Sequence, residues 1–123
     1  MVSNSMSLAT WGYITWYVAA IGTPLFCGGA YDPSAAWLAL PVEEYLSGRA
    51  ECGDLYAVWV DGDLAFLPAL DAGGFGDHCV LRTDGCYDIP ADLPRHLFRW
   101  RWRSRRGYVI NSQSFRDRLE RER

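Results

Sequence analysis

The stretch LYAVWVDGDLAFLPALDAGGFGDH, residues 55–78, indicates how this chain folds. Two apolar runs, residues 55–60 and 63–70, are joined by Asp61-Gly62. An Asp-Gly pair between two apolar runs is typical of the two-residue type I′ turn of a β-hairpin. The sequence therefore predicts a hairpin built from these two runs.

The second run leads directly to one carboxylate, Asp71, which is followed by the glycine-rich residues 72–76. Glycine permits tight turns and leaves open space around the acid. A carboxyl group at the end of a buried strand, facing a cleft, is partly desolvated and can be adapted for proton transfer. Asp71 is therefore the candidate catalytic residue, and the capping of a turn is the alternative role.

Apolar and aromatic runs separated by glycine and proline predict further short elements. In the first half of the chain these are a strand or hairpin over residues 9–19, a buried strand over 25–27, a helix over 34–38 capped by Ser34, and a helical turn over 41–46. In the second half they are a hairpin of residues 79–82 with 86–89, a strand over 97–103, a strand over 108–110, and a helix over 112–123.

Length and composition place these elements in one mainly β domain over residues 1–123. A chain of 123 residues with half of them hydrophobic is long enough to bury its own core. Six Trp and seven Tyr favour strands, and twelve Gly and six Pro supply the turns between them.

Charge is distributed unevenly along the chain. Residues 1–94 contain two bases and twelve acids, whereas residues 95–123 contain ten arginines and three acids, for a net charge of −3. Aromatic and Arg residues alternate in LFRWRWR, which predicts a strand with an Arg face. This Arg-rich strand suits an acidic partner, either within the fold or across a homodimer.

Four cysteines, Cys27, Cys52, Cys79 and Cys86, permit two disulfides with three open pairings. If the chain matures in an oxidising compartment, we expect Cys27 to pair with Cys52 and Cys79 with Cys86. The cysteines lack Cys-x-x-Cys spacing, so the sequence predicts no metal site and no cofactor.

The first 31 residues carry no charged side chain, which is one feature of a membrane span. Glycine, threonine and proline interrupt them, and their Tyr, Trp and Thr content suits strands, so no membrane span is expected. A signal peptide with a basic n-region is also not expected, because Arg49 is the first base.

Read in order, short landmarks of the chain resemble the RlpA-like family of double-psi β-barrels, which is related in fold to expansins and bacterial 3D domains. The landmarks are ATW at 9–11, CGGAYDP at 27–33, WLALP at 37–41, CGD at 52–54, VWVDG at 58–62, LDAGGFG at 70–76 and YDIP at 87–90. The resemblance implies a six-stranded double-psi β-barrel with short helical turns and a C-terminal helix.

In that family the acid at the position of Asp71 lies in the groove of the barrel, and members bind or cut cell-wall polysaccharide. The resemblance therefore implies a peptidoglycan-like glycan strand as partner, and an extracellular or cell-envelope location, with the cytoplasm as the alternative. RlpA-like lytic enzymes also use a His in the segment that matches residues 36–41, and this chain has none there. Lytic glycosidase activity through Asp71 is accordingly the finer hypothesis, and glycan binding the coarser one.

Glycosidic cleavage needs an acid and usually a second carboxylate. We expect Asp32 or Asp77 to supply it, and Tyr31 and Trp37 to offer flat platforms for sugar rings. The predicted substrate-binding residues are thus Tyr31, Asp32, Trp37, Asp77 and His78.

Two other functions remain open from the sequence. Cys52, His78 and Asp88 occur in the order of a papain-like cysteine enzyme, which needs a thiolate beside an oriented imidazole. The interleaved Arg and Trp of residues 95–106 could instead bind nucleic acid or another protein through phosphate contacts and stacking.

Overall fold

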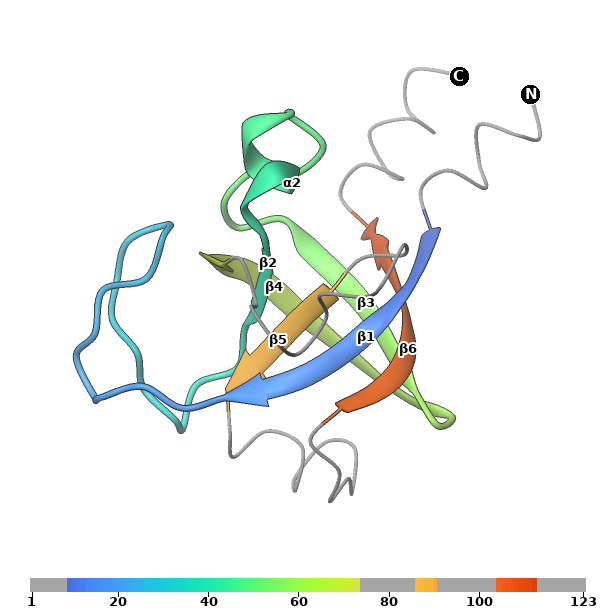
Figure 1. Cartoon of the computed structure of the whole chain (residues 1–123), viewed down its shortest axis with the longest axis horizontal. Coiled ribbons are helices and arrows are strands. Elements are labelled where there is room, and N and C mark those ends of the chain that lie inside the picture. Colours follow the sequence, from blue (N-terminus) through green and yellow to red (C-terminus); the bar gives the residue numbers. More distant parts are fainter. Residues whose placement is uncertain (1–8, 74–85, 91–103, 113–123) are drawn as a thin grey trace.

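Six strands account for most of the regular structure in the computed structural model of the chain, which describes residues 9–73, 86–90 and 104–112 (Figure 1). They are β1 (Ala9–Tyr17), β2 (Leu38–Pro41), β3 (Leu55–Val60), β4 (Asp63–Gly73), β5 (Cys86–Pro90) and β6 (Ser104–Asn111). One short helix, α2 (Val42–Leu46), lies between β2 and β3.

The strands form a closed barrel in the order β1-β5-β2-β4-β3-β6. The pairs β1–β5 and β2–β4 are parallel, and the other neighbours are antiparallel. Closure leaves no open sheet edge, which is one way in which β-proteins avoid unwanted pairing. The predicted fold class, a mainly β six-stranded barrel, is confirmed; the predicted C-terminal helix lies outside the described residues.

The β3–β4 hairpin has the turn that the sequence predicted. Asp61 and Gly62 both have positive φ, 52° and 86°, as a type I′ turn requires. The register pairs Val60 with Asp63 and continues to Leu55 and Pro68. Strand β4 runs three residues further than expected, so Asp71 lies within the strand and not after it.

Alternating residues of the strands fill the interior of the barrel. The main core cluster consists of Ile14, Leu38, Leu40, Ala50, Tyr56, Val58, Val60, Ala65, Leu67, Ala69, Tyr87, Ile89 and Val109. Gly107 on β6 is required here, because a Cβ atom at this position would meet Ile14 Cδ1 and lie 2.8 Å from the carbonyl oxygen of Trp59.

A second cluster lies outside the barrel, under the long connection between β1 and β2. We call residues 18–37 the β1–β2 loop; it projects to one side of the barrel (Figure 1). Its buried members are Leu25, Tyr31 and Trp37, and the partly buried Tyr17 and Leu70 pack against them. The loop is thus attached to the barrel by its own small core.

Three local predictions in this half of the chain need comment. The helix predicted over residues 34–38 is wrong, because Leu38 begins β2 and pairs with β4. The buried strand predicted over residues 25–27 is also wrong, since the loop has only the isolated bridge Pro24↔Ala30 and Phe26 is exposed. The helical turn over residues 41–46 is confirmed as α2, with Glu43 and Glu44 in its first turn.

Residues 9–19 contain one continuous strand and no hairpin, because Gly12 remains in register with Gly107 of β6. The predicted strand over 108–110 is confirmed within the longer β6. The strands predicted over 79–82 and 97–103, and the Arg and Trp residues of 95–103, lie outside the described residues.

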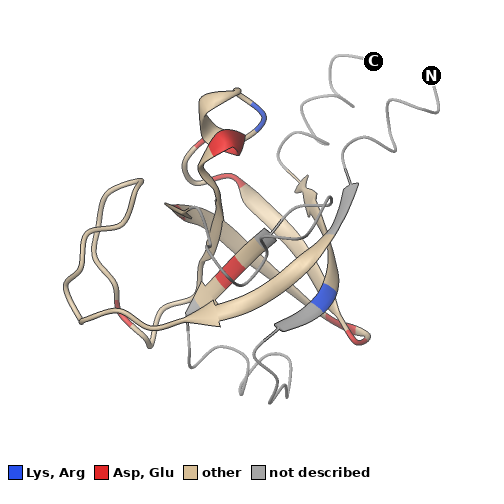
Figure 2. Cartoon of the chain, viewed as in Figure 1, with Lys and Arg blue, Asp and Glu red and all other residues tan. Residues whose placement is uncertain are grey.

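In Figure 2, acidic residues colour parts of α2, β5, the β3–β4 turn and the loops, whereas the arginines lie on β6 and just after α2. Within the described segments, no helix combines the length and apolarity needed to cross a membrane.

Candidate functional site

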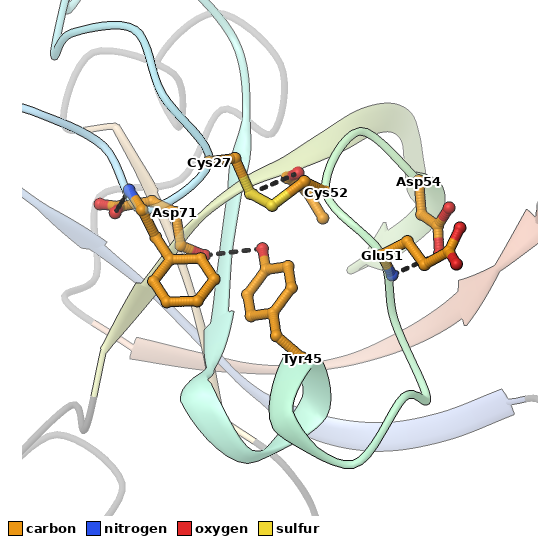
Figure 3. The surroundings of a disulfide bond; sticks show 8 residues. Cys27, Tyr45, Glu51, Cys52, Asp54 and Asp71 are labelled. Carbon is orange, nitrogen blue, oxygen red and sulfur yellow. Dashed lines mark hydrogen bonds between the residues drawn. A yellow bond between two sulfur atoms is a disulfide. The ribbon is translucent and has the colours of Figure 1, made fainter.

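Asp71, the predicted catalytic residue, is held by two donors that use different carboxylate oxygens. The hydroxyl of Tyr17 donates to Oδ2 at 2.9 Å, and the backbone N–H of Phe26 donates to Oδ1 at 2.9 Å. The hydroxyl of Tyr45 donates to the backbone carbonyl of Asp71 at 2.8 Å (Figure 3). Asp71 as a residue is partly buried and not fully enclosed.

Tyr17 connects Asp71 to the small core under the β1–β2 loop. The indole Nε1–H of Trp37 donates to the Tyr17 hydroxyl oxygen at 2.6 Å, which leaves the Tyr17 proton to point at Asp71. Burial raises the pKa of Tyr17 well above its ordinary value, the hydrogen bond from Trp37 lowers it, and Asp71 and Asp88 raise it further. Tyr17 is therefore a neutral phenol that donates to the carboxylate.

Tyr31 and Trp37 are buried, with 2% and 1% of their surface exposed. Their rings meet edge to face at 5.4 Å between centroids, and the Tyr31 hydroxyl donates to the carbonyl of Tyr17 at 3.3 Å. The prediction that they provide platforms for sugar rings is wrong for this conformation, because no ring face is open to a ligand. Both residues instead hold Tyr17 in place.

Asp32, a predicted second carboxylate, is exposed and shapes a turn. Its Oδ1 accepts hydrogen bonds from the backbone N–H of Ser34 at 2.9 Å and from the Ser34 hydroxyl at 2.7 Å. These bonds lower the pKa of Asp32. An Asp that caps the residue two positions later is a common turn arrangement. Asp77 and His78, also predicted for the site, lie outside the described residues.

Asp88 is the second carboxylate that the barrel brings toward Asp71. Ala39 of β2 pairs with Asp71 of β4 on one side and with Asp88 of β5 on the other. Neighbouring strands lie about 4.8 Å apart, so the two Cα atoms are separated by about 10 Å. Asp88 is buried, and its charge contributes to the raised pKa of Tyr17, so both carboxylates act on one phenol.

The sequence points to Asp88 only as part of the papain-like arrangement with Cys52 and His78. An acid between Tyr87 and Ile89, both buried, stands out because an ionised carboxylate is costly to bury without partners. Only the pairing of β5 with β2 shows that Asp88 lies in register with Asp71, across Ala39.

The papain-like alternative is wrong, because Cys52 forms a disulfide with Cys27, with 2.05 Å between the sulfur atoms and 5.5 Å between the Cα atoms. A sulfur in a disulfide cannot act as the thiolate nucleophile that such an enzyme needs. The predicted pairing of Cys27 with Cys52 is confirmed; Cys79 lies outside the described residues.

The disulfide also fixes the loop residues that hold Asp71 (Figure 3). Cys27 donates its backbone N–H to the carbonyl of Leu70 at 2.9 Å, and Gly53, next to Cys52, donates to the carbonyl of Ala69 at 2.8 Å. Both segments joined by the disulfide are therefore hydrogen-bonded to β4 at the two residues that immediately precede Asp71. Over the described parts of the chain, no group of three or more His, Cys, Asp or Glu is arranged to hold a metal ion.

The architecture belongs to the class of closed six-stranded barrels found in expansins. The apo crystal structure of the expansin of Clavibacter michiganensis superposes with a TM-score of 0.60 at 21% sequence identity. The match covers 83% of this chain and 49% of the expansin chain, so this chain corresponds to about half of that protein. At this identity the likeness establishes the fold. No protein-family model matches the sequence, and no curated protein matches it.

Proposed function

We propose that this chain binds cell-wall polysaccharide at the Asp71 site, as the resemblance to RlpA-like proteins implies. The observation that carries the proposal is the carboxylate of the partly buried Asp71, held in a fixed orientation by Tyr17 and Phe26. The expansin-like barrel supports it at the level of fold.

The geometry suits recognition of sugar hydroxyl groups. A carboxylate has about four lone-pair positions, and Asp71 uses one on each oxygen for Tyr17 and Phe26. The remaining positions can accept hydrogen bonds from hydroxyl groups on neighbouring carbons of a sugar. Charge-assisted hydrogen bonds of this kind are stronger than neutral ones and fix the orientation of the ligand.

The finer proposal is lytic cleavage of a peptidoglycan-like strand, in which Asp71 in its protonated form gives its proton to the glycosidic oxygen and takes up the proton of the sugar hydroxyl that attacks the anomeric carbon. A hydrolytic route would need a second carboxylate; Asp77, predicted for that role, lies outside the described residues, and Asp88 is the buried acid that the register brings nearest in the sheet. Peptidoglycan as the polymer, and an extracellular or envelope location, belong to the same proposal. The Cys27–Cys52 disulfide supports an oxidising compartment.

Sedimentation with purified peptidoglycan, followed by analysis of released muropeptides, tests the proposal. For a binding protein, we expect Asp71→Asn to weaken sedimentation several-fold, because one acceptor oxygen becomes a donor. For a lytic enzyme, the same variant should reduce muropeptide release by about 10²-fold or more, the usual contribution of a positioned acid–base group.

The melting temperature should stay within a few degrees in either case, since Asn preserves the shape of Asp. Absence of sedimentation and of release with the unmodified chain would reject the proposed function. Global unfolding of Asp71→Asn would show that Asp71 is a structural cap.

A further inference from the structure

Phe26 is an exposed aromatic residue between two residues that are less exposed. Half of its surface, 50%, is accessible, whereas Leu25 is buried and Cys27 is partly buried in the disulfide. An exposed aromatic ring on its own has no functional meaning. Its position relative to Asp71 distinguishes this one.

The backbone of Phe26 is held at the carboxylate of Asp71, and its ring packs on a neighbouring tyrosine. Its backbone N–H donates to Asp71 Oδ1 at 2.9 Å, and the adjacent Cys27 is tied to Cys52. The ring packs on Tyr45 with 4.8 Å between centroids and 32° between planes, and Tyr45 in turn donates to the backbone of Asp71 (Figure 3). A ring that is already held in place loses little conformational freedom when a ligand binds.

Phe26 lies beside one charged group, Asp71, and its own loop is mostly apolar. The β1–β2 loop has no charged residue before Asp32, and it also exposes Val18 and Ile21. Ligand sites typically combine apolar or aromatic surface with a few placed polar groups, and here the ring supplies the first and Asp71 the second. A pyranose ring has the matching chemistry, with an apolar C–H face and hydroxyl groups at its edge.

We infer that Phe26, packed on Tyr45, is the stacking subsite for a pyranose unit whose hydroxyl groups bond to Asp71. The inference rests on the proposed function and deepens it, because it names the residue that gives the affinity. The ligand is an uncharged sugar face, which both peptidoglycan and a neutral β-glucan present.

The test compares two exposed phenylalanines of the same chain. Phe66 on β4 has 57% of its surface exposed but pairs with Ala57 in the β3–β4 hairpin, five residues before Asp71. Phe26→Ala and Phe66→Ala therefore remove similar exposed rings, one beside the carboxylate and one away from it. Binding is measured by sedimentation with peptidoglycan and, separately, with microcrystalline cellulose.

We expect Phe26→Ala to weaken binding by about tenfold or more, as the loss of an aromatic anchor usually does. Phe66→Ala should stay within about twofold of the unmodified chain. Phe26→Leu should bind as poorly as Phe26→Ala, because it keeps apolar bulk without a flat ring, and Phe26→Trp should restore binding. Retention on both polymers identifies the shared sugar face as the ligand, and retention on one identifies its source.

The inference is overturned if Phe26→Ala binds like the unmodified chain while Asp71→Asn does not. It is also overturned if Phe26→Leu binds normally, since apolar bulk would then be sufficient, or if both alanine variants lose binding equally. Failure of the unmodified chain to bind either polymer rejects the proposed function itself, which separates the two failures. Non-reducing mass spectrometry of each variant verifies that the Cys27–Cys52 bond is intact.

Discussion

Two regions of this barrel expose aromatic and aliphatic side chains, and they differ in what surrounds them. One is the β1–β2 loop with Phe26, and the other is the outer sheet face, which we define as the exposed Trp59, Leu64 and Phe66 with the partly buried Tyr108 that packs on Trp59. On the outer sheet face Trp59 pairs with Leu64 and with Tyr108, so apolar groups meet apolar groups across the strands. Beside Phe26, a carboxylate, a phenol and a disulfide meet instead.

The difference shows that exposure alone does not mark a site. Exposed apolar groups are common on soluble proteins and need no special explanation when they are scattered. An exposed aromatic residue that is hydrogen-bonded to a carboxylate, in a loop held by a disulfide, is a more specific combination. Phe26 has this combination. Removing the disulfide should therefore affect the loop region, and changing the packing at Gly107 should affect the sheet region.

The largest effect is expected from the disulfide of the loop region. Replacing both Cys27 and Cys52 by Ser removes a cross-link between residues 25 apart, which should lower the free energy of unfolding by about 3 kcal/mol. Binding to polysaccharide should fall as well, because the Phe26 N–H is no longer held against Asp71. Urea unfolding under non-oxidising conditions, with sedimentation beside it, measures both.

Unmodified chain treated with a reductant provides the control for the serine substitutions. If stability falls while binding is unchanged, the hydrogen bonds of the loop are sufficient to place Phe26, and the disulfide contributes only stability.

An intermediate effect is expected on the sheet side. Gly107→Ala places a Cβ atom against Ile14 Cδ1 and 2.8 Å from the carbonyl oxygen of Trp59, and such overpacking typically costs about 2 kcal/mol. Polysaccharide binding should stay unchanged, because the β1–β2 loop is not involved. Thermal unfolding and sedimentation together check this separation of stability from binding.

Ile14→Val in the same chain offers a matched test, since it removes the Cδ1 atom that the new Cβ would meet. The double variant should therefore recover part of the stability that Gly107→Ala loses, because the effects of substitutions at residues in contact are usually not additive. Equal and additive losses would show that the clash is with the backbone at Trp59.

These regions also differ in how far the sequence predicted them. For the β3–β4 hairpin the sequence predicts the exact turn residues, because Asp61-Gly62 and the two apolar runs around it are local signals. Strand β2 was missed because Leu38 and Leu40 are extended only through pairing with β4, some thirty residues further along the chain. Local propensity favoured a helix, and the tertiary pairing prevailed.

The site was predicted in part for the same reason. Asp71 was identified from its own strand, but its partners Tyr17 and Phe26 lie 54 and 45 residues away. The sequence predicts that Tyr31 and Trp37 face a ligand, whereas in the structure both are buried in the small core under the loop. Asp88 is connected to Asp71 through Ala39, a relation that the barrel creates.

The smallest effect is expected from Tyr17→Phe, which acts at the junction of the loop and the barrel. The substitution removes the oxygen that accepts from Trp37 Nε1 and the proton that Asp71 Oδ2 accepts. Trp37 is buried, so its N–H loses its partner, and the free energy of unfolding should fall by about 1 kcal/mol at neutral pH. Urea unfolding of the variant and of the unmodified chain measures the loss.

The pH dependence of this loss is its sharpest test. Burial raises the pKa of Tyr17 above the ordinary value of 10.0, so the unfolded chain releases this proton at a lower pH than the folded chain does. The stability that Tyr17 contributes is therefore present below pH 10.0 and declines as the pH rises above it. Tyr17→Phe has no phenol proton to release, so its stability should decline less steeply in alkali and the difference in free energy of unfolding from the unmodified chain should become smaller. A difference that stays constant above that pH would mean that the Tyr17 hydroxyl is not desolvated against Asp71, and the fixed orientation of the carboxylate would lose its physical basis.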